Sequence, residues 1–374
     1  MDLICFSHLR WNFVYQRPQH LLSRFAKKRK TFYVEEHLYS NDGDGYTLEY
    51  TNEGVTRIIP FLNKENNINH DNNARLKIIL DKFFSEHQIT QYMFWYYTPM
   101  AIPFTYHFTP ALVVYDCMDE LSAFKFAPPE LRDNEHSLLG LSDLVFTGGN
   151  SLYRNKKQHH PNVWSMPSSI DKAHFQVARY MVQQPFDQEE IPHPRLGFFG
   201  VIDERFDIAL IDAAAQAVPE WNFIFIGPVV KIDESSLPRH KNIHYLGGKT
   251  YQQLPSYLSG WDVALIPFAI NESTEYISPT KTPEYLAAGI PVVSTPIKDV
   301  IDPYGDLNLV SIGYNVEEFI SKVKQELSRT DRKVWLHKVD NYLAKISWDN
   351  TWEKMDELIK QELNKKSNFI TQKV

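Results

Sequence analysis

The chain has 374 residues, of which 43% are hydrophobic and 14% aromatic, and this length predicts two or three packed domains. Such a composition excludes a disordered chain. A formal net charge of −7, with no large basic excess in either half, excludes a general nucleic-acid-binding protein.

The cysteine and hydropathy patterns bear on the compartment. Cys5 and Cys117 are the only cysteines, and each lies in an apolar run typical of a buried strand, so we expect no disulfide framework and a reducing environment. The N-terminus lacks a basic region before its short apolar stretch, and no apolar segment approaches the ~20 residues that span a bilayer. We therefore expect a cytoplasmic protein. The basic run 27–30 indicates a solvated helix end, with peripheral contact at the inner face of the membrane as the alternative.

Short β-rich apolar runs alternate with longer helical patterns along most of the chain, as in parallel sheets covered on both faces. A polar stretch with several prolines at 183–194 interrupts this rhythm and is typical of a linker. An amphipathic helix with Ser347 as N-cap is predicted to follow the second domain. The predicted strands are residues 3–8, 31–35, 57–61, 91–98, 112–117 and 143–148 before the linker, and 196–202, 222–226, 242–246, 262–267 and 291–294 after it.

Two such domains in series create a cleft at the carboxyl ends of their strands, where open α/β folds bind ligands. The first strand of the second domain ends at Gly200, and Arg205 follows five residues later. A glycine there lets backbone amides approach an anion, and the arginine can reach a phosphate. A simple strand-to-helix turn is the alternative.

The run 278–289 is the strongest local signal, because it predicts a helix with early prolines and a glycine at its C-terminal end. Its N-terminus would point free amides toward the cleft, and Lys281 would add a positive charge suited to a diphosphate. The carboxylate of Glu284, three residues later, could accept hydrogen bonds from two ribose hydroxyls. A surface Lys-Glu pair on an ordinary helix is the alternative.

This run resembles the donor-site helix and following strand of GT-B glycosyltransferases, in which the pattern P-x-K-x-x-E-Y-x-A-x-G-x-P-V-V is characteristic. Residues 197–205 resemble the phosphate loop of the donor domain, residues 225–228 its next strand end, and residues 245–247 its base-contacting strand. The runs 13–21 and 115–120 resemble bacterial transferases of polysaccharide clusters. The resemblance implies that the donor contacts are Gly200, Arg205, Gly227, Leu246, Ser278, Thr280, Lys281 and Glu284.

The resemblance also implies the architecture. Two Rossmann-like domains would face each other across the cleft, with residues 1–182 binding the acceptor and residues 190–346 binding a nucleotide sugar. The C-terminal helix, 347–374, would cross back to the first domain.

One motif departs from the retaining GT-B pattern. Those enzymes carry E-x₇-E, but the position eight residues before Glu284 holds Tyr276, and Glu275 misses it by one residue. The chain looks closer to the xanthan glucuronosyltransferase type, which inverts. Retention of configuration is therefore not assumed.

An inverting transfer needs a base that takes the proton of the acceptor hydroxyl. Asp116 and Asp119 lie at the end of the predicted strand 112–117, at the edge that faces the cleft. Asp119 lies beyond the strand and is the predicted base, although it could instead cap the segment that follows. Asp116 is the second catalytic candidate, with a role in orienting the loop.

The predicted acceptor residues are His8 and Trp11, in the loop after the first strand, and Arg17, which opens the next helix. An aromatic side chain among polar donors is a usual surface for a sugar ring. The alternatives are a loop held by the packing of Trp11 and an Arg17 that pairs with a neighbouring carboxylate. The aromatic run 95–97, at the end of another strand, also favours a carbohydrate acceptor.

Several motifs predict no chemistry. Asp42-Gly43-Asp44 mimics the D-x-D metal motif, but it lies in a glycine- and asparagine-rich turn. His159-His160 lacks a third ligand at metal spacing. No dinucleotide fingerprint, Walker loop or nucleophile elbow occurs. We expect no metal and no cofactor.

The leading hypothesis is a metal-independent glycosyltransferase that moves a sugar from a nucleoside diphosphate sugar, UDP-linked, to a glycan or a lipid-linked glycan in surface polysaccharide synthesis. A non-hydrolysing UDP-sugar epimerase of the same fold is one alternative. A non-catalytic module that binds sugar nucleotides or glycans is the other.

Overall fold

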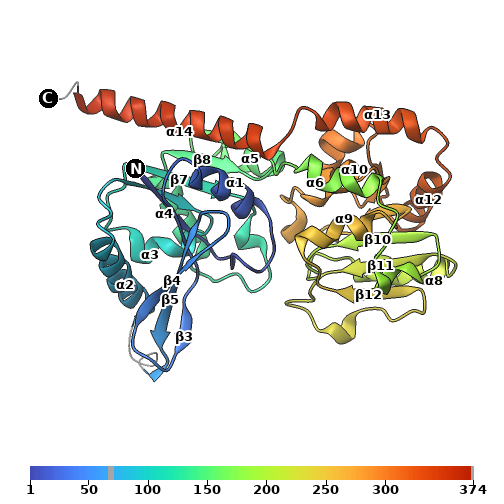
Figure 1. Cartoon of the computed structure of the whole chain (residues 1–374), viewed down its shortest axis with the longest axis horizontal. Coiled ribbons are helices and arrows are strands. Elements are labelled where there is room, and N and C mark those ends of the chain that lie inside the picture. Colours follow the sequence, from blue (N-terminus) through green and yellow to red (C-terminus); the bar gives the residue numbers. More distant parts are fainter. Residues whose placement is uncertain (66–70, 372–374) are drawn as a thin grey trace.

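A computed structural model describes residues 1–65 and 71–371 of the chain. Figure 1 shows two α/β domains side by side, each built on a central sheet, with a long C-terminal helix along one side of the first domain. The predicted two-domain α/β architecture is confirmed. In the first domain the strands are β1 (Asp2–Phe6), β2 (Thr31–Val34), β3 (Leu38–Ser40), β4 (Gly45–Tyr50), β5 (Thr56–Asn63), β6 (Tyr92–Tyr96), β7 (Leu112–Cys117), β8 (Leu144–Thr147) and β9 (Val163–Ser165), and the helices are α1 (Arg17–Ala26), α2 (Asn72–Glu86), α3 (Ile102–Thr105), α4 (Leu131–Leu141) and α5 (Asn150–Lys156).

The first sheet has the order β3-β5-β2-β1-β6-β7-β8-β9, and β4 pairs with β5 in the antiparallel direction. The strands β1, β2, β6, β7 and β8 pair in parallel, so their carboxyl ends share one edge. Their side chains are almost all buried, as expected of strands covered on both faces.

The second sheet has the order β12-β11-β10-β13-β14-β15 and is parallel throughout its described pairs. Its strands are β10 (Arg195–Phe199), β11 (Asn222–Ile226), β12 (Ile243–Gly247), β13 (Val263–Ile266), β14 (Val292–Ser294) and β15 (Ser311–Ile312). The helices after the first domain are α6 (Lys172–Gln176), α7 (Phe186–Glu189), α8 (Ile208–Ala217), α9 (Leu254–Leu258), α10 (Lys281–Ala287), α11 (Lys298–Val300), α12 (Val316–Leu327), α13 (Arg332–Leu343) and α14 (Trp348–Thr371).

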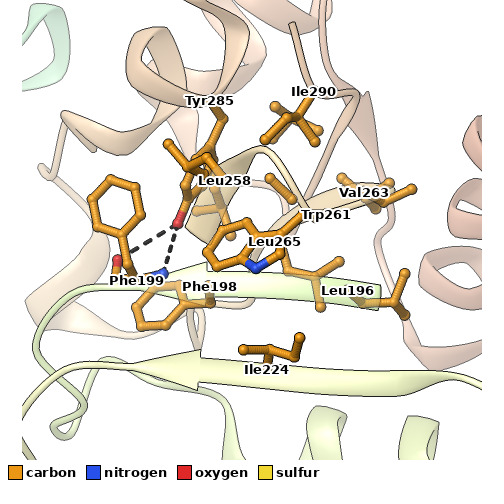
Figure 2. Close-up of a cluster of buried hydrophobic side chains, with 14 of the residues drawn as sticks. Leu196, Phe198, Phe199, Ile224, Leu258, Trp261, Val263, Leu265, Tyr285 and Ile290 are labelled. Carbon is orange, nitrogen blue, oxygen red and sulfur yellow. Dashed lines mark hydrogen bonds between the residues drawn. The ribbon is translucent and has the colours of Figure 1, made fainter. Parts of the chain in front are cut away.

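The core of the second domain fixes α10 against β10, as Figure 2 shows. Tyr285 of α10 is fully buried, and its hydroxyl accepts a hydrogen bond of 3.0 Å from the backbone N–H of Phe199. Gly197 lies under the indole of Trp261, which a Cβ at this position would approach to 2.0 Å. This packing sets the position of the residues that precede Tyr285 on α10.

The helix α14 returns to the first domain, as predicted for the C-terminal segment. Trp348, Met355 and Ile359 are buried in a core cluster with Phe25 of α1 and Trp95 of β6. Burying each such side chain contributes about 1.5–3 kcal/mol. None of the described helices is long and apolar enough to cross a bilayer.

The boundary between the domains differs from the predicted one. Ile170, Phe175 and Ala178 belong to the core cluster of the second domain, so the chain leaves the first domain before residue 170 and not within 183–194. The polar stretch 183–194 is fixed to the second domain, because the buried side chain of Gln188 on α7 donates a hydrogen bond to the carbonyl of Tyr257 and accepts one from Trp261 Nε1. The polar composition of 183–194 predicts an exposed linker. The apolar side chains at 170–178 come before this stretch, and their burial places the chain in the second domain earlier than its composition suggests.

Candidate active site

A cleft of about 1160 Å³ lies between the domains, at the carboxyl ends of the parallel strands. Its walls include the segments that follow β1 and β7 in the first domain, those that follow β10, β11 and β12 in the second, and the start of α10. The predicted site residues that line it are His8, Trp11, Arg17, Asp119, Gly200, Arg205, Gly227, Ser278, Thr280, Lys281 and Glu284.

Two predicted site residues do not line the cleft. Leu246 packs against the core of the second domain because it lies on β12, whose side chains cover that core. Asp116 is fully buried within β7. Sequence spacing placed both at a strand end but did not show which way each side chain points.

Lys281 and Glu284 form the centre of the second domain's wall. Lys281 Nζ lies 5.5 Å from the ring centroid of Phe198, and neither Lys281 nor Glu284 makes an ion pair within the described residues. Burial lowers the pKa of Lys281 and raises the pKa of Glu284. Both side chains are half-buried in the cleft wall, and two charged groups with shifted pKa values and no ion-pair partner at such a place are typical of a binding site.

Two glycines make room for this lysine. A Cβ on Gly200 would lie 2.2 Å from Lys281 Cε, so any side chain there would displace the lysine. Gly227 packs in turn against Gly200, because its Cβ would approach the Gly200 carbonyl oxygen to 1.8 Å. Both have positive φ angles, +136° and +146°, which L-residues with side chains rarely adopt. Both strand ends therefore require glycine, and the approach of their amides to an anion stays a prediction.

Arg205 is held in a fixed orientation beside them. Its Nε and Nη2 donate to the carboxylate of Asp203, with Nη2 to Oδ2 at 2.6 Å. Asp203 is almost fully buried and was not predicted as a site residue. It lies two residues before Arg205 in the loop after β10, and this position in the sequence was the available signal that it belongs to the site.

Asp116 and Arg17 form a buried ion pair across the first sheet. Arg17 Nη2 donates to Asp116 Oδ1 at 2.7 Å, Nε donates to both carboxylate oxygens, and Nη1 donates to the carbonyl of Met166 at 2.7 Å. Burial alone would lower the pKa of Arg17, and the Asp116 carboxylate raises it above its ordinary value. All three guanidinium nitrogens are therefore engaged. The predictions of Asp116 as a catalytic candidate and of Arg17 as an acceptor ligand give way to a structural pair, which is the alternative expected for Arg17.

Asp119 lies just past the end of β7 and lines the cleft. Burial raises the pKa of its carboxyl from 3.8 to about 6, against the charges of Arg205 and Lys281. Its carboxylate forms no hydrogen bond to any of the described residues. It is therefore a first-domain carboxylate that is free to contact a substrate in the cleft.

The two remaining acceptor candidates differ in what they offer. Burial lowers the pKa of His8 to about 4, so its ring is neutral at pH 7, and its buried Nδ1 has no hydrogen-bond partner among the described residues. Trp11 is almost fully buried against Tyr33, at 5.0 Å between ring centroids. Trp11 thus mainly holds the loop, whereas His8 offers a free polar atom.

Part of the second domain matches a known family. Residues 193–329 match the model of the family described as "Glycosyl transferases group 1". A 103-residue stretch is 33% identical to the "Putative teichuronic acid biosynthesis glycosyltransferase TuaH" of Bacillus subtilis (strain 168). That match covers 27% of this chain and 26% of the relative, so it spans about a quarter of the relative's length.

Solved structures match nearly the whole chain. A sucrose-phosphate synthase from Thermosynechococcus elongatus has a TM-score of 0.69 at 12% identity, covering 96% of this chain and 98% of that one. Anabaena Alr3699/HepE, in complex with UDP and glucose, has a TM-score of 0.67 at 10% identity, covering 96% and 100%. The fold is GT-B. The GT-B fold that the resemblance implied is thereby confirmed.

The motif that departs from retaining GT-B enzymes lies outside the cleft. Tyr276 packs against the core of the first domain, and its hydroxyl accepts a hydrogen bond from Asn155 Nδ2. Glu275 is exposed and pairs with Lys298 at 2.8 Å. Neither residue lines the cleft opposite Glu284.

Two other sequence signals are explained by burial or by hydrogen bonding. Trp95, Tyr96 and Tyr97, expected to favour a carbohydrate acceptor, are at most 2% exposed and form part of the GT-B core instead. They lie in and just after β6, which is covered on both faces. Asp44, of the discounted D-x-D run, accepts hydrogen bonds from Arg75 and from the backbone of Asn63.

Tyr251 is a cleft residue that the sequence did not reveal. Its ring stacks on His174 at 4.1 Å and lies 4.9 Å from Tyr15 of the opposite domain. Its buried hydroxyl has no partner among the described residues. Its place shortly after the predicted strand 242–246 was the only available signal.

Proposed function

We propose that the chain is a glycosyltransferase that moves a sugar from a nucleoside diphosphate sugar, UDP-linked, to a glycan or lipid-linked glycan acceptor in surface polysaccharide synthesis. The observation that carries this proposal is that Lys281 and Glu284, half-buried and without an ion-pair partner among the described residues, line the cleft next to the fixed guanidinium of Arg205. The family match over 193–329 and the name of the Bacillus relative support the activity and the biosynthetic context.

The proposed mechanism divides the work between the two walls. Lys281 and Arg205 would stabilise the negative charge that develops on the leaving diphosphate, and Glu284 would accept hydrogen bonds from the ribose hydroxyls. Asp119, on the opposite wall, would take the proton from the acceptor hydroxyl as the new glycosidic bond forms and the bond to the diphosphate breaks.

Acceptor-dependent release of UDP from UDP-sugars tests this function directly. A glycosyltransferase releases UDP in step with glycan product. Acceptor-free interconversion of two UDP-sugars would instead establish the epimerase alternative. Tight UDP binding with no turnover of any donor and acceptor pair would establish the binding module.

Replacing Lys281 by Ala should weaken UDP binding while leaving the fold intact. The change removes a charge-assisted contact worth about 1.5–3 kcal/mol, which corresponds to a loss of about 10- to 150-fold in affinity. Isothermal titration calorimetry with UDP measures the effect, and an unchanged melting temperature provides the control. Equal UDP affinity in the variant and the wild type would remove Lys281 from the donor site.

Chelation of divalent metals by EDTA should leave activity unchanged. We propose metal-independent transfer because Lys281 and Arg205 can supply the positive charge that a D-x-D enzyme obtains from a cation. The assay compares initial rates with and without EDTA. Complete loss on chelation, restored by Mn²⁺, would contradict this prediction.

We also propose that the reaction takes place in the cytoplasm, at the inner face of the membrane, where a lipid-linked acceptor would lie. The support is chemical, since Cys5 and Cys117 are both buried free thiols and Lys27, Lys28 and Lys30 are exposed. Cell fractionation tests this location, and recovery from the extracellular fraction would contradict it.

A further inference from the structure

The segment that carries Asp119 also reaches the opposite wall of the cleft. It runs from Met118 through the 3-10 helix η3 (Leu121–Ala123) to Phe124 and Lys125. Phe124 lines the same cleft as Asp119 and Arg205. The proposed base thus lies a few residues before a side chain that contacts Arg205, one of the proposed phosphate ligands.

One end of this segment is fixed inside the first domain. Glu120 Oε2 accepts a hydrogen bond of 2.7 Å from Lys156 Nζ, and Ser122 Oγ donates to Glu120 Oε1 at 2.9 Å. Lys156 is almost fully buried and also pairs with Glu135 at 2.8 Å. This network holds Glu120, and with it the adjacent Asp119, against α5.

The other end contacts two cations of the second domain. The guanidinium carbon of Arg205 lies 5.2 Å from the ring centroid of Phe124, and Lys231 Nζ lies 5.3 Å from the same centroid. The backbone N–H of Lys125 donates to Glu204 Oε1 at 3.2 Å. Both cation distances are within the range of a cation–π interaction.

The two cations differ in how they are otherwise held. Arg205 is fixed by Asp203, whereas Lys231 has no ion-pair partner in the described parts of the chain. Lys231 has a φ of +62°, in a loop that follows β11, and its charge helps to lower the pKa of His8 across the cleft, after burial. Without the Phe124 ring, Arg205 and Lys231 would lose the cation–π contacts that offset the repulsion between their positive charges.

We propose that Phe124 is a positioning residue for the donor diphosphate. Its ring holds Arg205 and Lys231 at the phosphate end of the cleft before the donor arrives, which lowers the ordering cost of binding. Lys231 thereby joins Lys281 and Arg205 as a ligand of the diphosphate. This inference rests on the proposed function, because it assumes that the cleft binds a nucleoside diphosphate.

The test compares three variants at one position by calorimetry with UDP and with uridine. Phe124→Leu keeps an apolar side chain but removes the ring, and we expect it to weaken UDP binding about tenfold and to leave uridine binding unchanged. Phe124→Tyr and Phe124→Trp keep a π face and should restore most of the UDP affinity. Thermal melting of each variant separates this effect from a loss of folding.

The outcomes separate the two proposals. If the wild type and Phe124→Leu bind UDP equally tightly, the role of Phe124 is overturned and the proposed function stands. Equal losses for UDP and uridine, or a loss that Tyr and Trp do not restore, would show a packing role and would also overturn it. Failure of the wild type to bind UDP would overturn the proposed function itself.

Discussion

Asp119→Asn should lower acceptor-dependent turnover by about 10²- to 10⁴-fold while UDP affinity stays near that of the wild type. The amide is nearly isosteric with the carboxylate but cannot accept the proton of the acceptor hydroxyl. Turnover measured at saturating donor, beside calorimetry with UDP, separates the chemical step from binding. Near-normal turnover in this variant would move the base to another residue.

The pH profile provides a second measurement of the same carboxylate. Because the pKa of Asp119 is raised to about 6, the wild-type rate should increase with pH below 6 and level off above it. The slower Asp119→Asn enzyme should lack this limb. A wild-type rate that shows no change between pH 5 and 7 would contradict the assignment.

Stability gives the matched control for Asp119. A carboxyl whose folded pKa lies above its unfolded value binds its proton more tightly when folded, so its ionisation lowers stability as pH rises through this range. Asp119→Asn removes that cost and should not lower the melting temperature at pH 7. Asp116→Asn, which weakens the buried pair with Arg17, should lower both melting temperature and activity.

Arg17→Met should destabilise the protein by about 3–5 kcal/mol, because it leaves the carboxylate of Asp116 buried without its partner. The midpoint of urea unfolding, monitored by tryptophan fluorescence, measures the change. The double variant Arg17→Met/Asp116→Leu removes both charges and should regain much of the lost stability. A single variant as stable as the wild type would show that the pair contributes nothing to the fold.

Much of the fold could be predicted because its parallel strands are continuous apolar runs. The predicted strand 112–117 coincides with β7 (Leu112–Cys117), and 222–226 coincides with β11 (Asn222–Ile226). The short strands β3 and β4 were not predicted, since they lie at the sheet edge with mostly exposed or half-exposed side chains. A local apolar signal is weak where only one face of a strand is covered.

The candidate site could be predicted where the helical spacing of a motif, here 278–289, places two polar side chains on one face of a helix. Lys281 and Glu284 lie on one helix that Tyr285 anchors to β10, and the structure places both at the cleft. Asp116 and Asp119 look equivalent in sequence. In the structure Asp116 lies within β7, and its side chain is buried against Arg17 of α1. Its partner Arg17 is 99 residues away in the chain, which no local pattern reveals.

Contacts between the two domains were also beyond local prediction. Phe124 and Arg205 meet only because the carboxyl edges of two separate sheets face each other. This contact depends on how the two domains pack across the cleft, and no periodic pattern in a single sequence reveals such a contact.

A crystal structure of the protein with UDP would test the central claim most directly. We expect the diphosphate to lie against Lys281 and Arg205, next to the backbone of Gly200, with the ribose hydroxyls at Glu284. UDP bound elsewhere, or a cleft that stays empty at saturating UDP in a protein that binds UDP in solution, would contradict the assignment of this cleft as the donor site.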